Sequence, residues 1–257
     1  MQGLLEPHYD ATLRRCRSQP VILAAQDSTS LNYTAHPATD DLGPLNTRAD
    51  RSQGLWMHDT LALTPDGVPL GLLDVQCWAR DPAQHGKAAQ RTRRMTQDHG
   101  ALWDFMQAQP VAGVQALSVP RRATAQARTA QLQVRHAQVE LKAPQRKAHL
   151  PPANLWVVSA CEAPAAGLAK PIEWMLLTTV PVDTFEQACE CLAWYARRWE
   201  IEVYHRTLKS GCQIQNRQLG QAKRLKACLA IDLVVAWRVF HLTQLAREQP
   251  DVQRTCG

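Results

Sequence analysis

Residues 194–211, "WYARRWEIEVYHRTLKSG", combine aromatic and charged side chains in a pattern that could do chemistry. At about 100° per residue, four of these side chains fall within about 60° on one face of a helix. They are Tyr195, Arg198, Glu202 and Lys209. Adjacent cations favour the ionised form of a carboxyl group, which suits a metal ligand better than a general acid. Tyrosine, arginine and lysine side chains that point the same way suit phosphate groups.

A simpler interpretation of this pattern is a solvated helix face. Arg198 and Glu202 are four residues apart, where an ion pair stabilises a helix by about 0.2–0.5 kcal/mol. A second carboxylate favours a site instead, because Asp27 ends the apolar run "PVILAAQD" at 20–27, which predicts a buried strand. Two separated carboxylates and a substrate phosphate can hold hard cations such as Mg²⁺, and two such ions can assist phosphodiester cleavage.

The spacing Y-x₂-R-x₃-E-x₆-K in this stretch resembles the YREK signature of bacterial insertion-sequence DDE transposases. The segments "AQDSTSLNY", "GPLNTRADRSQGLWMHDTLAL" and "PIEWMLLTTVPV" also resemble parts of that family, so that the resemblance runs from about residue 21 to about residue 248. It implies an α/β fold, with an RNase H-like mixed sheet flanked by helices and interrupted by a small antiparallel β module. It also implies metal-dependent DNA cleavage and strand transfer at transposon ends.

The same resemblance assigns roles to individual residues. Asp27 and Glu202 would be the catalytic metal ligands, for Mg²⁺ or Mn²⁺ in a weak or partial site. Trp174 would stack on an extruded base, although a core tryptophan at a strand start is an alternative interpretation. The residues that would contact DNA are Tyr195, Arg198, Arg206, Lys209 and Trp174.

The sequence departs from the family pattern at the third acid. In the family this aspartate follows an apolar strand, in a segment like G-D-R-E-G-D, and here it should fall within residues 79–113. That interval contains neither the motif nor the strand, and Asp81 and Asp98 lie in polar context. We therefore expect one core strand to be missing and cleavage to be impaired, as in an internally deleted and truncated transposase.

The same comparison predicts how the chain is divided. The expected parts are a remnant N-terminal segment at 1–20, the first part of the core at 21–113, the β insertion module at 114–170, and the second part of the core at 171–257. The apolar strand at 174–180 should then belong to the core, where it either pairs directly beside residues 21–27 or leaves a gap.

Turn and cap residues predict the remaining elements. Pro65-Asp66-Gly67 marks the turn of a hairpin between 54–63 and 68–81. Thr184 is the expected N-cap of one long helix, and Gly211 is its expected C′ glycine. A second helix at about 218–248 is apolar nearly all round, so we expect it to be largely buried.

Composition favours a polyanionic partner. The chain carries a formal charge of +6, and its basic residues are clustered, which fits nucleic acid although single clusters also suit solvated surface. No stretch of 18 consecutive apolar residues occurs and no secretory signal is present, so we expect no membrane partner and a cytoplasmic, nucleoid-associated protein. The eight cysteines are irregularly spaced, which is typical of reduced thiols.

Other functions remain open at this point. The chain could be a non-catalytic DNA-binding protein that competes with a full-length transposase, as a homodimer or as a heterodimer with that enzyme. It could also be a metal-dependent nuclease without strand transfer. A glycosidase-like pair of carboxylates is disfavoured, because the basic surroundings of Glu202 oppose a protonated general acid.

Overall fold

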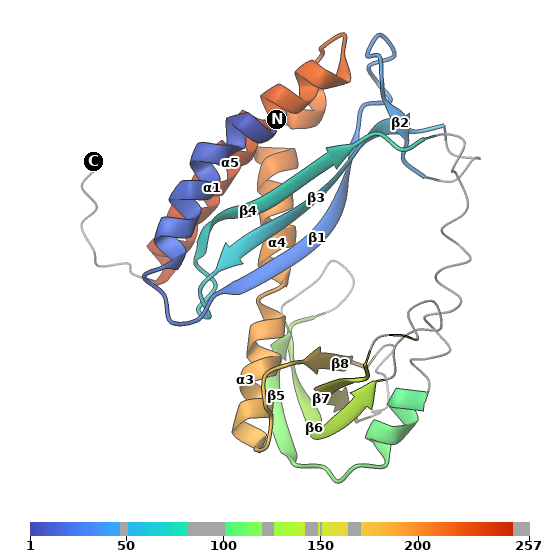
Figure 1. The fold of residues 1–257 in the computed structure, drawn as a ribbon, viewed down its shortest axis with the longest axis vertical. Coiled ribbons are helices and arrows are strands. Elements are labelled where there is room, and N and C mark those ends of the chain that lie inside the picture. The colour runs from blue at the N-terminus through green and yellow to red at the C-terminus, as the bar shows by residue number, and fades with distance from the viewer. Residues whose placement is uncertain are drawn as a thin grey trace. The chain divides into compact units, whose positions relative to one another are not determined.

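The computed structural model describes residues 1–46, 51–81, 101–119, 126–141, 149, 151–163 and 171–248. The chain forms two compact units: the first unit comprises Met1–Ala89 with Arg197–Gly257, and the second unit comprises Gln90–Ala196. Each unit contains one sheet and its own helices (Figure 1). The predicted α/β class is confirmed. The predicted mixed sheet is wrong, because every pair of strands among the described residues is antiparallel.

The sheet of the first unit is built on a central hairpin. Its strands are β1 (Leu23–Asn32), β2 (Gly43–Pro44), β3 (Gln53–Leu63) and β4 (Pro69–Trp78). β3 pairs with the other three strands, and the predicted hairpin is confirmed by Gly67, whose φ of 92° requires glycine. β1 is longer than predicted and continues through residues 28–32, because each of its residues pairs with β3 from Leu23↔Leu63 to Asn32↔Gly54.

The N-terminal helix α1 (Gln2–Cys16) belongs to this unit and covers the outer edge of β4. The Gln2 side chain donates to the Val75 carbonyl, and His8 Nε2 accepts the Leu72 N–H at 3.1 Å. These bonds satisfy edge groups of a strand that would otherwise be open to pairing with another chain. Most of residues 1–20, predicted as a remnant segment, thus form a helix that packs on the sheet and buries Leu5 in the core.

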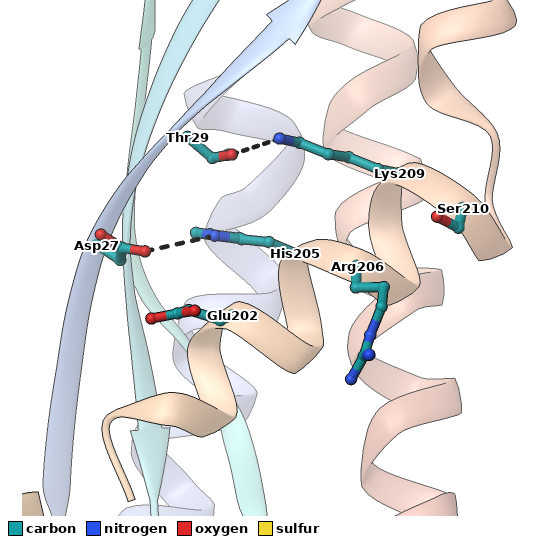
Figure 2. A pocket seen from close by; sticks show the side chains of 7 residues that line it. All are labelled: Asp27, Thr29, Glu202, His205, Arg206, Lys209 and Ser210. Carbon is teal, nitrogen blue, oxygen red and sulfur yellow. Dashed lines mark hydrogen bonds and ion pairs between the residues drawn. The ribbon is translucent and has the colours of Figure 1, made fainter. Parts of the chain in front are cut away.

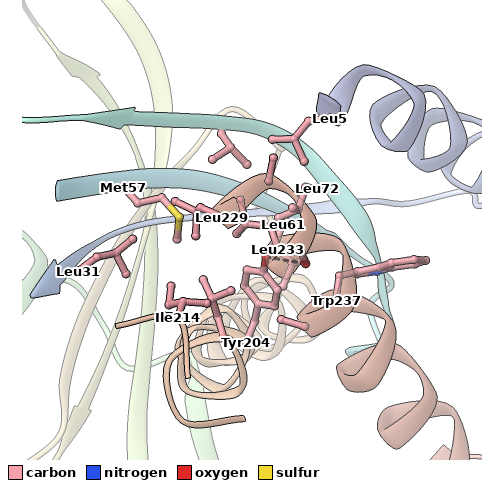
Figure 3. Packing of buried hydrophobic residues seen from close by; sticks show 14 of the residues in the cluster. Leu5, Leu31, Met57, Leu61, Leu72, Tyr204, Ile214, Leu229, Leu233 and Trp237 are labelled. Carbon is pink, nitrogen blue, oxygen red and sulfur yellow. Dashed lines mark hydrogen bonds between the residues drawn. The ribbon is translucent and has the colours of Figure 1, made fainter. Parts of the chain in front are cut away.

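Two further helices close the core of the first unit. They are α4 (Trp199–Arg206) and α5 (Ala222–Glu248), and α1 lies beside α5 (Figure 1). The buried cluster in Figure 3 joins sheet and helices, and Tyr204 donates its hydroxyl to the Leu233 carbonyl at 3.1 Å. Each fully buried aliphatic side chain contributes about 1.5–3 kcal/mol. The helix α5 is only partly buried, contrary to the prediction, because Ile231, Val235 and Val239 lie on its exposed face.

The second unit contains the predicted antiparallel β module with one additional strand. Its strands are β5 (Gly113–Val119), β6 (Arg128–Leu141), β7 (Ala153–Glu162) and β8 (Glu173–Thr178), in that order across the sheet. The apolar strand assigned to the core by sequence is β8, and it pairs with β7 instead, with Trp174 opposite Ala160. It therefore does not pair beside β1. Residues 101–107 form a short helix before Pro110.

The long helix predicted at 184–211 is divided into three pieces. They are α3 (Phe185–Ala196) of the second unit, α4, and a π-helical turn, η3 (Thr207–Gly211). Thr184 caps α3 as predicted, because its hydroxyl accepts the Gln187 N–H at 3.3 Å while the Gln187 side chain accepts the Thr184 N–H. Gly211 is not a left-handed C′ residue; Gln213, with φ of 51°, takes that conformation.

The helix break at residues 197–198 has a local cause. The N–H groups of Glu200 and Ile201 bond to the carbonyls of Arg197 and Arg198, three residues back, which tightens the backbone into a 3₁₀-type turn. The Arg197 side chain leaves the helix direction and donates to the Pro65 carbonyl at 3.1 Å. A periodic sequence pattern does not reveal such a tightening, since the side-chain spacing is almost unchanged.

Buried His8 predicts an acid sensitivity of the first unit. Burial, helped by the charge of Arg15, lowers the His8 pKa from 6.5 to about 4, and His8 Nε2 is already an acceptor for the Leu72 N–H. Between these pH values only the unfolded chain binds the proton, so stability falls as the pH drops from 6.5 towards 4. Allowing for solvent screening, we expect a loss of about 2 kcal/mol over this range.

Urea denaturation at pH 6.5 and pH 4.5 measures this acid sensitivity. The His8→Gln variant keeps a hydrogen-bonding side chain but does not titrate, so its stability should fall less than that of the parent protein over the same interval. An equal fall in both proteins would show that His8 is not the group responsible.

Candidate functional site

A pocket of about 370 Å³ lies beside β1, at the segment formed by α4 and η3 (Figure 2). Its lining residues come from these two regions of the first unit. They are Asp27, Thr29, Glu202, His205, Arg206, Lys209 and Ser210. Asp27 and Thr29 are two residues apart on a strand and therefore share a face. Glu202, Arg206 and Lys209 follow the spacing of successive helical turns, so that α4 and η3 present them on one side.

The two predicted metal-facing carboxylates both face this pocket. The side chains of Asp27 and Glu202 are 33% and 34% exposed, so each is held by the fold yet open to a ligand. Figure 2 shows them approaching the same space from β1 and from α4. Glu202 also accepts a hydrogen bond from Arg198 at 3.1 Å, so the predicted helix ion pair exists as well.

Two cationic side chains share the pocket with these carboxylates. Lys209 Nζ donates to Thr29 Oγ1 at 2.6 Å, which fixes the ammonium group beside β1. Burial lowers the Lys209 pKa, and the nearby Asp27 carboxylate partly opposes this effect. Arg206 is exposed at the pocket wall. An anion that entered the pocket would meet two positive groups, one of them partly desolvated and therefore stronger in its electrostatic effect.

A buried carboxylate and a histidine that the sequence analysis missed lie behind Asp27. Asp59 is directly opposite Asp27 across β1 and β3, and it is fully buried. His205 Nε2 bonds to Asp59 Oδ1 at 2.7 Å, and its Nδ1 lies 3.9 Å from Asp27 Oδ2. Two features of the sequence could have indicated these residues. They are an aspartate inside the apolar strand "GLWMHDTLAL" and a histidine one helical turn after Glu202.

The other predicted site residues are placed elsewhere. Tyr195 and Trp174 belong to the second unit, where their rings pack edge to face with centroids 5.2 Å apart. Arg198 contacts Glu202 without lining the pocket. Asp81 is exposed and does not line the pocket, and Asp98 lies outside the described residues. The pocket thus combines four of the seven predicted residues, Asp27, Glu202, Arg206 and Lys209.

The donor set of the pocket fits one divalent ion better than two. Only two carboxylates line it, and no three His, Cys, Asp or Glu side chains among the described residues already stand close enough together to hold a metal ion. One hard cation with two carboxylates, completed by water or phosphate oxygens, is a common arrangement for Mg²⁺.

Comparison with known protein families gives no assignment, because no family model matches this chain. Across the ranges that the structure describes, no helix combines the length and apolar character needed to cross a membrane. The functional conclusion therefore depends on the residues of the pocket themselves.

Proposed function

We propose that this chain is a DNA-binding protein of the insertion-sequence transposase type, impaired in metal-dependent cleavage and strand transfer. The observation that carries the proposal is the pocket of the first unit, where Asp27 and Glu202 meet Arg206 and Lys209. Carboxylates from a strand and a helix, next to cations, form an arrangement that suits a phosphate bound together with a divalent ion. The YREK spacing supports the same proposal independently of the geometry.

In this proposal the cations provide most of the affinity for DNA. Arg206 can donate to two phosphate oxygens at once, while Lys209 acts as a fixed point charge held by Thr29. Asp27 and Glu202 would hold a single Mg²⁺ or Mn²⁺, which when bound would polarise a phosphate oxygen. With two carboxylates at the pocket, a second ion lacks ligands among the described residues.

A second candidate function is competition with a full-length transposase for transposon ends. The chain would either occupy the transposon end itself or form a mixed dimer with the full-length enzyme. The contact that favours it is the Arg198–Glu202 ion pair at 3.1 Å, which neutralises one carboxylate of the pocket. This reduces the repulsion of an incoming phosphate and favours binding over catalysis.

Removing the two cations should weaken DNA binding and its salt dependence. For Arg206→Ala/Lys209→Ala we expect an affinity loss of at least about tenfold for a labelled duplex of about 30 base pairs, and a salt slope smaller by about 2, since each phosphate contact contributes about 0.9. Fluorescence anisotropy over a range of salt concentrations measures both quantities. Arg238→Ala removes an exposed cation of α5 and is the matched control. Unchanged affinity in the double variant would rule out the pocket as the DNA site.

Impaired cleavage is tested on the same protein. Incubated with Mg²⁺ or Mn²⁺ and transposon-end duplex DNA, it should give no nicking above that of a Glu202→Ala variant, because the described residues supply the pocket with no third acid. Gel electrophoresis of end-labelled strands makes the comparison. Strong nicking that EDTA stops and Glu202→Ala abolishes would contradict the loss of cleavage.

A further inference from the structure

The geometry of the pocket points to a third metal-binding group. We propose that Asp27, Glu202 and the Nδ1 atom of His205 together hold one divalent transition-metal ion, such as Mn²⁺, Co²⁺ or Zn²⁺. The inference rests on the proposed function in taking Asp27 and Glu202 as metal-facing. It adds a nitrogen ligand that neither the YREK spacing nor the acid pattern indicates. A nitrogen ligand favours divalent transition-metal ions.

The orientation of His205 supports this role. An ionised carboxylate only accepts hydrogen bonds, so the 2.7 Å contact makes Nε2 the donor to Asp59, and in the neutral imidazole Nδ1 then carries the lone pair. Nδ1 is on the side of the ring facing Asp27 (Figure 2). Metal-binding histidines commonly donate their other ring N–H to a carboxylate, which fixes the ring and increases its basicity.

The spacing of the donor atoms is also suitable. Two atoms bound to one ion at about 2.1 Å lie about 3.0–4.2 Å apart, depending on the angle between the bonds. His205 Nδ1 and Asp27 Oδ2 are 3.9 Å apart, which is within this range and too long for a hydrogen bond. His205 is only 6% exposed, and its Nδ1 faces the Asp27 carboxylate. One ion could therefore lie between this nitrogen and that carboxylate.

The third ligand closes the site by side-chain rotation. Glu202 has one oxygen bonded to Arg198, and its other oxygen is available on a side chain that is one-third exposed. Asp27 is equally exposed and can turn on β1. Because Asp59 and His205 are buried and fixed, the ion would draw the two mobile carboxylates towards the immobile ring. This explains why three ligands do not already converge.

The imidazole ligand determines which ions should bind. Mg²⁺ prefers oxygen ligands, whereas imidazole suits transition metals such as Co²⁺ and Zn²⁺. We therefore expect Co²⁺ and Zn²⁺ to bind at least about tenfold more tightly than Mg²⁺.

The experiment uses the full chain without DNA, so that its outcome is separate from that of DNA binding. Co²⁺ titration followed by visible absorption gives the affinity, and the contact-shifted ring N–H signal of a Co²⁺-bound histidine in NMR spectra of the unmutated protein identifies the ligand. Asp27→Asn and Glu202→Gln should each weaken Co²⁺ binding at least about tenfold, and Asp59→Asn about 10–100-fold. His58→Ala changes the neighbouring position on β3, whose side chain contacts Ser28, and is the control.

The NMR spectra and the metal affinities distinguish a site that includes the His205 nitrogen from a site made of carboxylates alone. A contact-shifted ring N–H signal from His205, with no effect of His58→Ala on Co²⁺ affinity, supports the proposal. Absence of this His205 signal in the Co²⁺-bound protein, or equal affinities for Mg²⁺ and Co²⁺, overturns it while leaving phosphate binding by Arg206 and Lys209 intact. Conversely, tight Co²⁺ binding at His205 in a protein that does not bind DNA would retain the metal site and reject the proposed function.

Discussion

Replacing His205 with alanine is expected to lower the free energy of unfolding by about 3–5 kcal/mol, because it leaves a buried carboxylate without its partner. Asp59 is fully buried, and its Oδ1 receives the 2.7 Å bond from His205. Its Oδ2 has no hydrogen-bond partner among the described residues. Without the imidazole, the folded protein must either keep an unpaired charge in its core or protonate Asp59, and both cost free energy. Urea denaturation monitored by tryptophan fluorescence measures the loss.

A double-mutant cycle separates the His205–Asp59 interaction from simple loss of packing. In Asp59→Ala/His205→Ala both partners are absent, so the double variant should be less destabilised than the sum of the two single variants, by about 0.5–3 kcal/mol. His58→Ala removes an imidazole one residue away on β3, where it hydrogen-bonds the Ser28 hydroxyl, and should cost no more than about 1 kcal/mol. Additive single changes would show that the pair is not coupled.

Local sequence patterns were sufficient to predict the elements that carry several of the pocket residues. The apolar run before Asp27 gave the correct strand, and the seven-residue spacing of Glu202 and Lys209 correctly placed both side chains on one side of a helical segment. These predictions hold because they depend only on strand alternation and helix periodicity. The same periodicity grouped Tyr195 with them, but the helix tightens at 197–198 and Tyr195 belongs to α3 of the second unit, so helix periodicity alone does not relate it to the pocket.

Contacts between residues far apart in the sequence could not be predicted from the sequence patterns. Asp59 and His205 are 146 residues apart, and their contact depends on the register of β3 against β1 and on the packing of α4. Strand β8 shows the same limit. Its apolar residues predict a buried strand correctly but carry no information about which neighbour it pairs with, so it was assigned to the wrong sheet. The packing of α1 on β4 was likewise not predicted, because the resemblance begins only at about residue 21.

The Trp237→Ala variant tests whether α1 is an integral part of the first unit. We expect an unfolding free energy lower by about 3–5 kcal/mol, since a large buried aromatic side chain is removed and a cavity remains. Trp237 Nε1 donates to the Pro69 carbonyl at 3.1 Å, and its ring contacts His8 edge to face at 4.8 Å. The Arg15 guanidinium lies over the same ring at 4.4 Å, a cation–π contact. One side chain of α5 thus holds both β4 and α1.

Hydrogen exchange shows whether the loss of Trp237 is transmitted to α1. The amides of α1 should exchange faster in Trp237→Ala by more than global destabilisation explains, because its contacts with His8 and Arg15 are lost together. Val239→Ala is the matched control on the same helix: this side chain is 51% exposed, so stability should change by no more than about 0.5 kcal/mol. If Trp237→Ala cost less than about 1 kcal/mol and α1 amides were unaffected, the packing of α1 against α5 would contribute little to the fold.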